Sequence, residues 1–300
     1  MTVATDAAAR IFKARPTLDG DRACPLCGRV ADPVAPRDAG FVTCEACSML
    51  YRCDTSVGSE SEHWAEYADN DTEQTYDAHR RHYYRTLWKW VRRMPARAHG
   101  TPQVLDVGAV PGMLLREAAN DGWGIHGAET SAELCEMTAE FCGACMWQGF
   151  VEEIDFRGQQ FDLITIADVF RAMTSPREAL EACFAALAPG GCLVIREINA
   201  AHERHRAGRI RHPYPFDMQF VDAASACAFL RAAHFDDVEV HNCPMSLLTV
   251  GPIGRLAHEA PAAYRAVLGA VNCAVGVLDI VPRIADRPVT PSFLAVGRKR

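Results

Sequence analysis

The sequence lacks a long uninterrupted hydrophobic run. Its most apolar stretch, residues 262–282, is broken by Arg265, Asn272 and Asp279, whereas a membrane-spanning helix needs roughly 18 consecutive apolar residues. Residues 1–16 contain no apolar segment ahead of a small-residue cleavage site, so a secretory signal is not expected. We therefore predict a cytoplasmic protein that makes no membrane contact, with residues 262–282 as a buried helix.

The sequence also lacks an excess of positive charge, internal repeats and low-complexity tracts. Its formal net charge is −7, and affinity for a nucleic acid duplex comes largely from Lys and Arg side chains that neutralise phosphates. A nucleic acid is therefore not the expected partner, although a local basic patch stays open. With 300 residues, 49% of them apolar, the chain can form one α/β domain of about 200 residues and a smaller module.

Cysteine is abundant, and four cysteines form a pattern. Cys24 and Cys27 make one C-x2-C pair, Cys44 and Cys47 make a second, and sixteen residues separate the pairs. Two tight turns with this spacing can present four thiolates to one zinc ion, and four cysteines leave no position for water. We predict a structural zinc site; two disulfides, which a reducing compartment disfavours, or chance spacing are the alternatives.

Residues 60–98 are rich in aromatic side chains and show helical periodicity. The positions with helical spacing are Tyr76, Arg80, Tyr83, Leu87 and Val91. One amphipathic helix that ends near Pro95 is expected, and it leads into the main domain.

From residue 102 onward, short apolar runs alternate with helical patterns. Strands are expected over residues 103–108, 124–129, 161–168, 192–198, 238–241 and 293–296, and helices over 113–121, 131–141, 176–187 and 223–233. The helix over 176–187 should be closed by Pro189-Gly190-Gly191, with the next strand starting at Cys192. This order predicts an α/β fold with a parallel sheet between two layers of helices, for which seven strands is the natural count.

A glycine-bounded turn joins the first of these strands to its helix. In the segment Leu105 to Gly112, Gly108 and Gly112 would let the backbone approach a ligand at the carboxyl edge of the sheet. Two glycines alone fit any strand-to-helix turn, but Glu129 ends the second strand, where a carboxylate can bind a ribose diol. NAD fits less well, because its turn normally has three glycines.

These features together resemble the class I S-adenosylmethionine (SAM)-dependent methyltransferases over residues 102–198. The family signature runs strand, D-x-G-x-G-x-G and acidic strand end; here Val110 replaces the middle glycine, and FDLITIADVF and LAPGGCLVIREIN match the next strands. CPLCG and FVTCEACSMLYR also resemble the zinc ribbon ahead of some bacterial methyltransferases, including sugar and natural-product enzymes. The resemblance implies a Rossmann-like seven-stranded sheet, a small N-terminal zinc-ribbon module and SAM as cofactor.

The resemblance also implies roles for individual residues. Asp106 and Gly108 would lie by the methionine part of SAM, Glu129 by the ribose, residues 149–151 by the adenine, and Asp168 beside the transfer site. The full set of expected cofactor contacts is Asp106, Gly108, Ala109, Gly112, Glu129, Thr130, Gly149, Phe150, Val151, Asp168 and Tyr83. Aromatic faces attract a sulfonium cation, so Trp64, Tyr76, Tyr83, Tyr84 and Trp88 form either a lid over the cofactor or the packed face of a helix.

Candidate catalytic groups follow the strand that ends near residue 198. His202, His205 and His212 lie in HERHRAGRIRH, where four arginines favour an anionic substrate, or the segment is a solvated basic loop. The motif HPYPFDMQF adds Tyr214, Asp217 and Phe220 near the expected substrate contacts. Many family members have Glu-His after the fourth strand, whereas this chain has Asp168-Val169-Phe170-Arg171-Ala172. The catalytic candidates are His202, His205, His212, Tyr214 and Asp168.

The expected organisation is a loosely ordered N-terminus (1–21), a zinc-ribbon module (22–58), a helical linker or lid (59–98) and a SAM-binding domain (99–300). The predicted function is SAM-dependent methyl transfer to a small anionic metabolite, by positioning and His-assisted deprotonation. A SAM-consuming cyclase or lyase, an RNA-directed methyltransferase and a degenerate SAM-binding protein are the alternatives. The oligomeric state is open, with a homodimer among the options.

Overall fold

The computed structural model describes residues 22–30, 40–53, 78–95, 100–201, 217–243 and 292–300, with six single or paired positions between 260 and 270. The helices are α4 (Ala78–Val91), α5 (Met113–Asn120), α6 (Ala132–Cys142), α7 (Pro176–Ala186) and α8 (Ala223–Ala232), with the 3-10 turns η1 (Val151–Glu153) and η2 (Phe170–Ala172). The strands are β1 (Phe41–Thr43), β2 (Leu50–Arg52), β3 (Gln103–Val107), β4 (Gly124–Glu129), β5 (Cys145–Gln148), β6 (Phe161–Ala167), β7 (Leu187–Ile198), β8 (Gln219–Phe220), β9 (Asp237–Cys243) and β10 (Ser292–Arg298).

Seven strands form the main sheet, in the order β5-β4-β3-β6-β7-β10-β9. The first five strands, from β5 to β7, are parallel to one another, and β10 runs antiparallel to both β7 and β9. The carboxyl ends of β3, β4 and β6 therefore meet at one edge, where the order reverses on either side of β3. The α/β class and the seven-stranded sheet expected from the sequence are confirmed, but β10 makes the sheet mixed and not wholly parallel as predicted.

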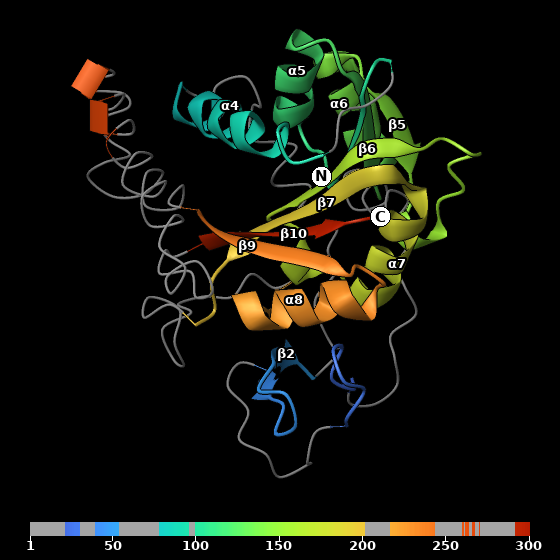
Figure 1. The fold of residues 1–300 in the computed structure, drawn as a ribbon, viewed down its shortest axis with the longest axis vertical. Coiled ribbons are helices and arrows are strands. Elements are labelled where there is room, and N and C mark those ends of the chain that lie inside the picture. Colours follow the sequence, from blue (N-terminus) through green and yellow to red (C-terminus); the bar gives the residue numbers. More distant parts are fainter. Residues whose placement is uncertain are drawn as a thin grey trace, which may run out of the picture.

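Helices cover both faces of this sheet, with α4, α5 and α6 on one face and α7 and α8 on the other (Figure 1). The alternation of side chains along each strand produces the two layers. On β6, Leu163 packs in the cluster that contains Leu115 of α5, whereas Ile164 packs in the cluster that contains Leu180 of α7. The sheet is thus buried on both sides, as its near-continuous apolar strands require.

A second, three-stranded sheet has the order β1-β2-β8, and Cys44 and Cys47 lie in the turn that joins β1 to β2. Its third strand comes from the far side of the sequence, since Leu50 pairs with Phe220 and Tyr51 with Gln219. We use the name cysteine module for residues 22–30 and 40–53, which lie beyond α8 in Figure 1, drawn in blue. The division of the chain at residues 21, 58 and 98 stays a prediction, but the sheet of this module is completed by a strand beyond all three boundaries.

Four points of the sequence prediction need revision or lie outside the described residues. The helix α7 stops at Ala186 and β7 already starts at Leu187, because Leu187 pairs with Phe161 ahead of a register shift; Pro189-Gly190-Gly191 therefore lies inside the strand. The strand β5 is not among the strands expected from the sequence. The loosely ordered N-terminus and most of the helix expected over 262–282 fall outside the described residues, among which no helix is long and apolar enough to cross a membrane.

Candidate active site and cysteine cluster

The turn between β3 and α5 brings backbone to the carboxyl edge of the sheet. Gly108 and Gly112 both have left-handed backbone, with φ of 72° and 90°, which glycine adopts without strain. A Cβ on Gly108 would collide with Val169, and one on Gly112 would lie 2.7 Å from the Sγ of Cys142. The N–H of Gly108 donates to Ala128 O on β4, so the turn is fixed by the neighbouring strand.

Glu129 ends β4 beside this turn, as the sequence predicts. Its Oε1 accepts hydrogen bonds from the backbone N–H of Thr130 at 2.7 Å and of Ser131 at 3.4 Å, and from Thr130 Oγ1 at 3.1 Å. The partly buried carboxylate is thereby held at the start of α6, where the helix end favours negative charge. Ser131 caps α6, since its hydroxyl accepts from Leu134 N.

Asp106 lies one residue before the end of β3, and its side chain is buried rather than directed to solvent. Its Oδ1 accepts a 2.6 Å hydrogen bond from Thr165 Oγ1 on β6. Burial raises the pKa of Asp106 to about 7, and the hydrogen bond from Thr165 opposes the shift. This carboxyl group thus changes its protonation near neutral pH.

The residues predicted to face the adenine follow β5. Gly149 has φ of 143°, and its N–H donates to Glu129 O, so this segment lies directly beside the end of β4. Phe150 precedes the 3-10 turn η1, whose first residue, Val151, is buried. The structure therefore places residues 149–151, Glu129 and the β3–α5 turn along the ends of three adjacent strands.

Asp168 follows β6 and is surrounded by polar partners from three elements. Its backbone has φ of 62°, which is uncommon outside glycine. Tyr83 of α4 donates its hydroxyl to Asp168 Oδ2 at 2.9 Å, and Arg196 of β7 pairs with Asp168 Oδ1. Burial raises the pKa of this carboxyl group, but Arg196 and then Arg171 outweigh it, and the net pKa lies below its ordinary value.

A buried ion network extends from Asp168 toward β8. Arg171 Nη1 lies 2.7 Å from Glu197 Oε1 and 3.5 Å from Asp168 Oδ1, and Arg171 Nε lies 3.0 Å from Asp217 Oδ1. Glu197 is fully buried. From the sequence, Arg171 is only a departure from the family pattern, and neither Arg196 nor Glu197 is predicted as a site residue. The sequence signal for this network is the pair of adjacent charges, Arg196 and Glu197, inside the apolar run of β7. Charged side chains that are buried need partners of opposite charge.

The predicted side chains are only partly brought together. Tyr83 and Asp168 meet, and Tyr83 is also close to Arg196, whose guanidinium lies 5.4 Å from its ring centroid. Asp217 and Phe220, expected near substrate, are buried against other residues of the fold. The candidates His202, His205, His212 and Tyr214, like Trp64 and Tyr76 of the aromatic set, lie outside the described residues.

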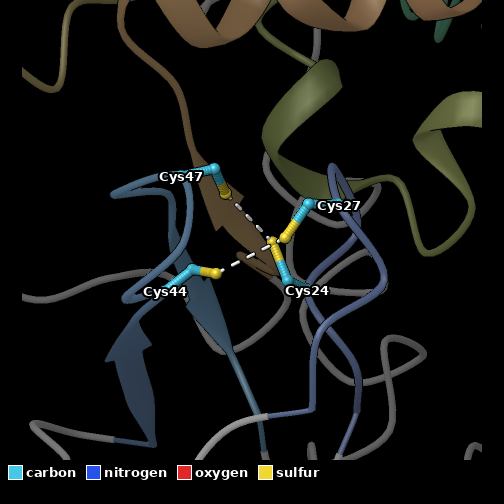
Figure 2. A group of neighbouring side chains, drawn as sticks. All are labelled: Cys24, Cys27, Cys44 and Cys47. Carbon is cyan, nitrogen blue, oxygen red and sulfur yellow. Dashed lines mark hydrogen bonds between the residues drawn. The ribbon is translucent and has the colours of Figure 1, made fainter.

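The four cysteines converge in the cysteine module. Their Sγ atoms all lie within 4.8 Å of one another, with 3.5 Å between Cys24 and Cys47 and between Cys27 and Cys44. Figure 2 shows each pair on its own loop with the sulfurs directed toward one another. Zinc–sulfur bonds of about 2.3 Å in a tetrahedron imply sulfur separations of about 3.8 Å, so the cluster has the size of a zinc site.

Two matching turns build this cluster. Gly28 N donates to Cys24 O and Ser48 N donates to Cys44 O, and Gly28 and Ser48 both have left-handed backbone. Burial opposes ionisation of Cys44, but the backbone N–H groups of Cys47 and Ala46 outweigh it and lower its pKa to about 7. The backbone N–H groups at Cys44 thus favour the thiolate form that binds metal, whereas burial outweighs such groups at Cys24 and Cys47 and raises the pKa of both thiols.

Comparison with known proteins agrees with this architecture. A family model described as a methyltransferase domain matches residues 76–240, and no curated protein sequence matches the chain. A SAM-dependent methyltransferase from Thermotoga maritima, described as a possible histamine N-methyltransferase, superposes with a TM-score of 0.54 at 16% identity, over 79% of this chain and 99% of that one. A SAM complex of phosphoethanolamine N-methyltransferase 2 from Haemonchus contortus gives 0.52 at 15% identity, over 83% and 62%. With more than half of its length matched by the family model, this chain belongs to the methyltransferase-domain family and is a SAM-dependent methyltransferase.

Proposed function

We propose that this enzyme methylates a small anionic acceptor, that the ends of β3, β4 and β5 hold SAM, and that the four cysteines hold a structural zinc ion. The observation that supports this most directly is the pairing of two left-handed glycines in the β3–α5 turn with Glu129 at the end of the adjacent strand. A glycine turn at the carboxyl edge of a parallel sheet, with a fixed carboxylate at the end of the next strand, is an arrangement that binds nucleoside-bearing ligands.

Each part of the proposed cofactor site has its own contribution. Gly108, Ala109 and Gly112 leave room for the methionine part, with Asp106 behind the turn; Glu129 and Thr130 face the ribose; residues 149–151 border the adenine. When bound, SAM supplies an electrophilic methyl group on a sulfonium. The protein then has to hold the acceptor in line with that group and exclude water.

Asp168 and Tyr83 would fix the transfer side of the site rather than remove a proton. A carboxylate whose pKa is lowered by Arg196 and Arg171 is a weak base. Burial also raises the pKa of Tyr83 well above its ordinary value, so its hydroxyl stays a donor to Asp168. Where the acceptor needs deprotonation, a histidine of residues 202–212 would take the proton. The arginines of the same segment would bind the negative charge of the acceptor.

The products of SAM turnover test the reaction itself. Purified enzyme is incubated with SAM and a panel of small carboxylates and phosphate esters, and nucleosides are measured by mass spectrometry. Methyl transfer yields S-adenosylhomocysteine (SAH) and an acceptor heavier by one methyl group. Methylthioadenosine without SAH would contradict methyl transfer and would support intramolecular displacement or elimination.

The ribose anchor is tested by SAH affinity in Glu129→Ala, measured by isothermal titration calorimetry. Loss of a charge-assisted pair of hydrogen bonds should weaken binding about 10- to 100-fold. Because Glu129 also accepts bonds at the start of α6, Glu129→Gln is measured beside it; this variant keeps an acceptor oxygen but loses the charge. Glu140→Ala, an exposed change on α6, is the control. Equal affinity in all four proteins would remove Glu129 from the site.

The zinc proposal is tested by metal analysis of the purified chain. We expect about one equivalent of zinc, and Cys27→Ser, which removes a ligand with little loss of packing, should reduce it strongly. Less than about half an equivalent in the unmodified chain would contradict the proposal.

A further inference from the structure

The loop that carries Asp168 is held by hydrogen bonds to its backbone carbonyl groups. We call residues 168–174 the β6 loop. Gln219 of β8 donates from Nε2 to Phe170 O at 2.6 Å and to Met173 O at 2.8 Å, and Met218 N donates to Arg171 O at 2.7 Å. Three carbonyls of the loop are therefore bound by two consecutive residues.

The same two residues are bound in turn by the cysteine module. Arg22 is buried, and it donates to Met218 O at 3.0 Å, to Gln219 Oε1 at 3.0 Å and to Thr174 O, a fourth loop carbonyl, at 2.9 Å. Arg22 lies two residues before Cys24, and its own N–H donates to Cys53 O. Its guanidinium thus joins the module, β8 and the β6 loop in one set of hydrogen bonds.

A second arginine of the module holds the start of the same segment. Arg52 donates from Nε to Asp217 O at 2.9 Å and from its backbone N–H to Met218 O at 2.8 Å. Asp217 in turn pairs with Arg171 of the β6 loop. The loop is therefore connected to the module both through its carbonyls and through the ion network around Asp168.

The cofactor turn is held by different contacts. Gly108 is fixed by Ala128 of β4 and Gly112 by Ala109 within the turn. Neither hydrogen bond involves the module or the β6 loop, and the turn meets that loop where Val169 lies against Gly108. The hydrogen bonds that fix the cofactor turn and those that fix the β6 loop therefore come from different regions of the chain.

We propose that Arg22 and Gln219 are positioning residues for methyl transfer, which make the cysteine module set the conformation of the β6 loop without setting the affinity for the cofactor. Neither residue touches the reacting atoms; they act through the backbone of the loop that presents Asp168 and Arg171. This inference rests on the proposed acceptor side of the site.

Gln219→Glu separates the two halves of this connection. A carboxylate at this position keeps an acceptor for Arg22, so the module stays joined to β8. It removes the amide donor and sets negative charge against Phe170 O and Met173 O, so the loop is released. Arg22→Gln is the complementary change, which weakens the bond to the module. Arg29→Gln is the control, because Arg29 is an exposed arginine of the module whose nearest acid is Glu45 at 3.8 Å.

Hydrogen exchange and SAH binding are the two measurements. In ligand-free Gln219→Glu and Arg22→Gln, peptides that cover the β6 loop should exchange about tenfold faster. Loss of a hydrogen bond to a loop carbonyl should raise the equilibrium constant for local opening by about that factor. Peptides from β6 and from the β3–α5 turn should keep their protection, and SAH affinity should stay within about twofold of the unmodified enzyme. Arg29→Gln should leave all these values unchanged.

Other outcomes overturn the inference. Unchanged exchange in the β6 loop shows that Arg22 and Gln219 do not hold it, and faster exchange in β6 with weaker SAH binding shows a merely structural role. If Gln219→Glu does not fold, Arg22→Gln alone decides by the same criteria. These measurements do not depend on zinc or on an identified acceptor, so their failure is distinct from failure of the metal or methyl-transfer experiments.

Discussion

Two aspartates at the ends of neighbouring parallel strands have opposite electrostatic surroundings. Asp106, on β3, is bound by Thr165 Oγ1, and burial raises its pKa to about 7. Asp168, just after β6, has its pKa lowered, because Arg196 and Arg171 outweigh the effect of burial. Aspartate is therefore titratable near neutral pH at the proposed cofactor side, and carries a fixed negative charge at the proposed acceptor side.

The difference reflects how each side of the site is built. On the cofactor side, backbone N–H groups and glycine conformations shape the surface, and a neutral hydroxyl is enough to satisfy Asp106. On the proposed acceptor side, side chains from α4, β7, the β6 loop and the segment just ahead of β8 form a network of arginines and carboxylates. A surface made from backbone tolerates many neighbouring sequences, whereas a buried ion network depends on every member.

The largest expected effect comes from removing a cation from the network. Arg171→Met would leave Glu197 and Asp217 buried without this partner, and should lower the free energy of unfolding by about 5 kcal/mol, the upper end for a broken buried pair. Urea unfolding followed by circular dichroism measures it. Arg85→Met, at an exposed pair with Glu117, is the control and should change stability by less than about 1 kcal/mol. Similar losses in both variants would show that the network is not a special feature of the acceptor side.

Asp106 gives the next largest effect, visible as a pH dependence. Its folded pKa lies above the unfolded value, so its contribution to stability is present below about pH 4 and is lost as pH rises through about 7. A shift of about three pKa units corresponds to about 4 kcal/mol. The variant Asp106→Asn should lack this decline. Between pH 4 and pH 8, the free energy of unfolding of the ligand-free variant, measured with urea, should therefore fall less than that of the unmodified chain. Parallel pH curves for the two proteins would refute the raised pKa.

The cofactor side was largely predictable from sequence, for a physical reason. Gly108, Gly112 and Glu129 lie within one local strand-turn-helix pattern and the next strand, and such patterns determine backbone conformation directly. The four cysteines were predictable in the same way, because their spacing within two tight turns sets the geometry of the cluster.

The acceptor side depends on contacts between distant segments. Arg22 and Gln219 meet across most of the sequence, and nothing local to either residue indicates the other. The pairing of β8 with β2 is a tertiary contact of the same kind, and it gives the cysteine module a strand that the sequence assigned to the main domain. Sequence reasoning finds residues that act through their neighbours in the chain, and misses those that act through the fold.

Tyr83→Phe provides the smallest and most selective change to Asp168. It removes one hydroxyl that donates to Asp168 Oδ2 at 2.9 Å, and should lower the free energy of unfolding at pH 7 by about 1–2 kcal/mol. Because this bond favours the ionised carboxyl group, whose folded pKa is lowered, the stability it supplies is present above the unfolded pKa and is lost as pH falls through the folded value. Tyr51→Phe is the matched control, since the buried hydroxyl of Tyr51 has no hydrogen-bond partner among the residues that the structure describes. The difference between the Tyr83 variant and the unmodified chain should therefore shrink as Asp168 becomes protonated in acid. A difference that stays constant after Asp168 is protonated would show that Tyr83 stabilises the fold by packing and not through the charge of Asp168.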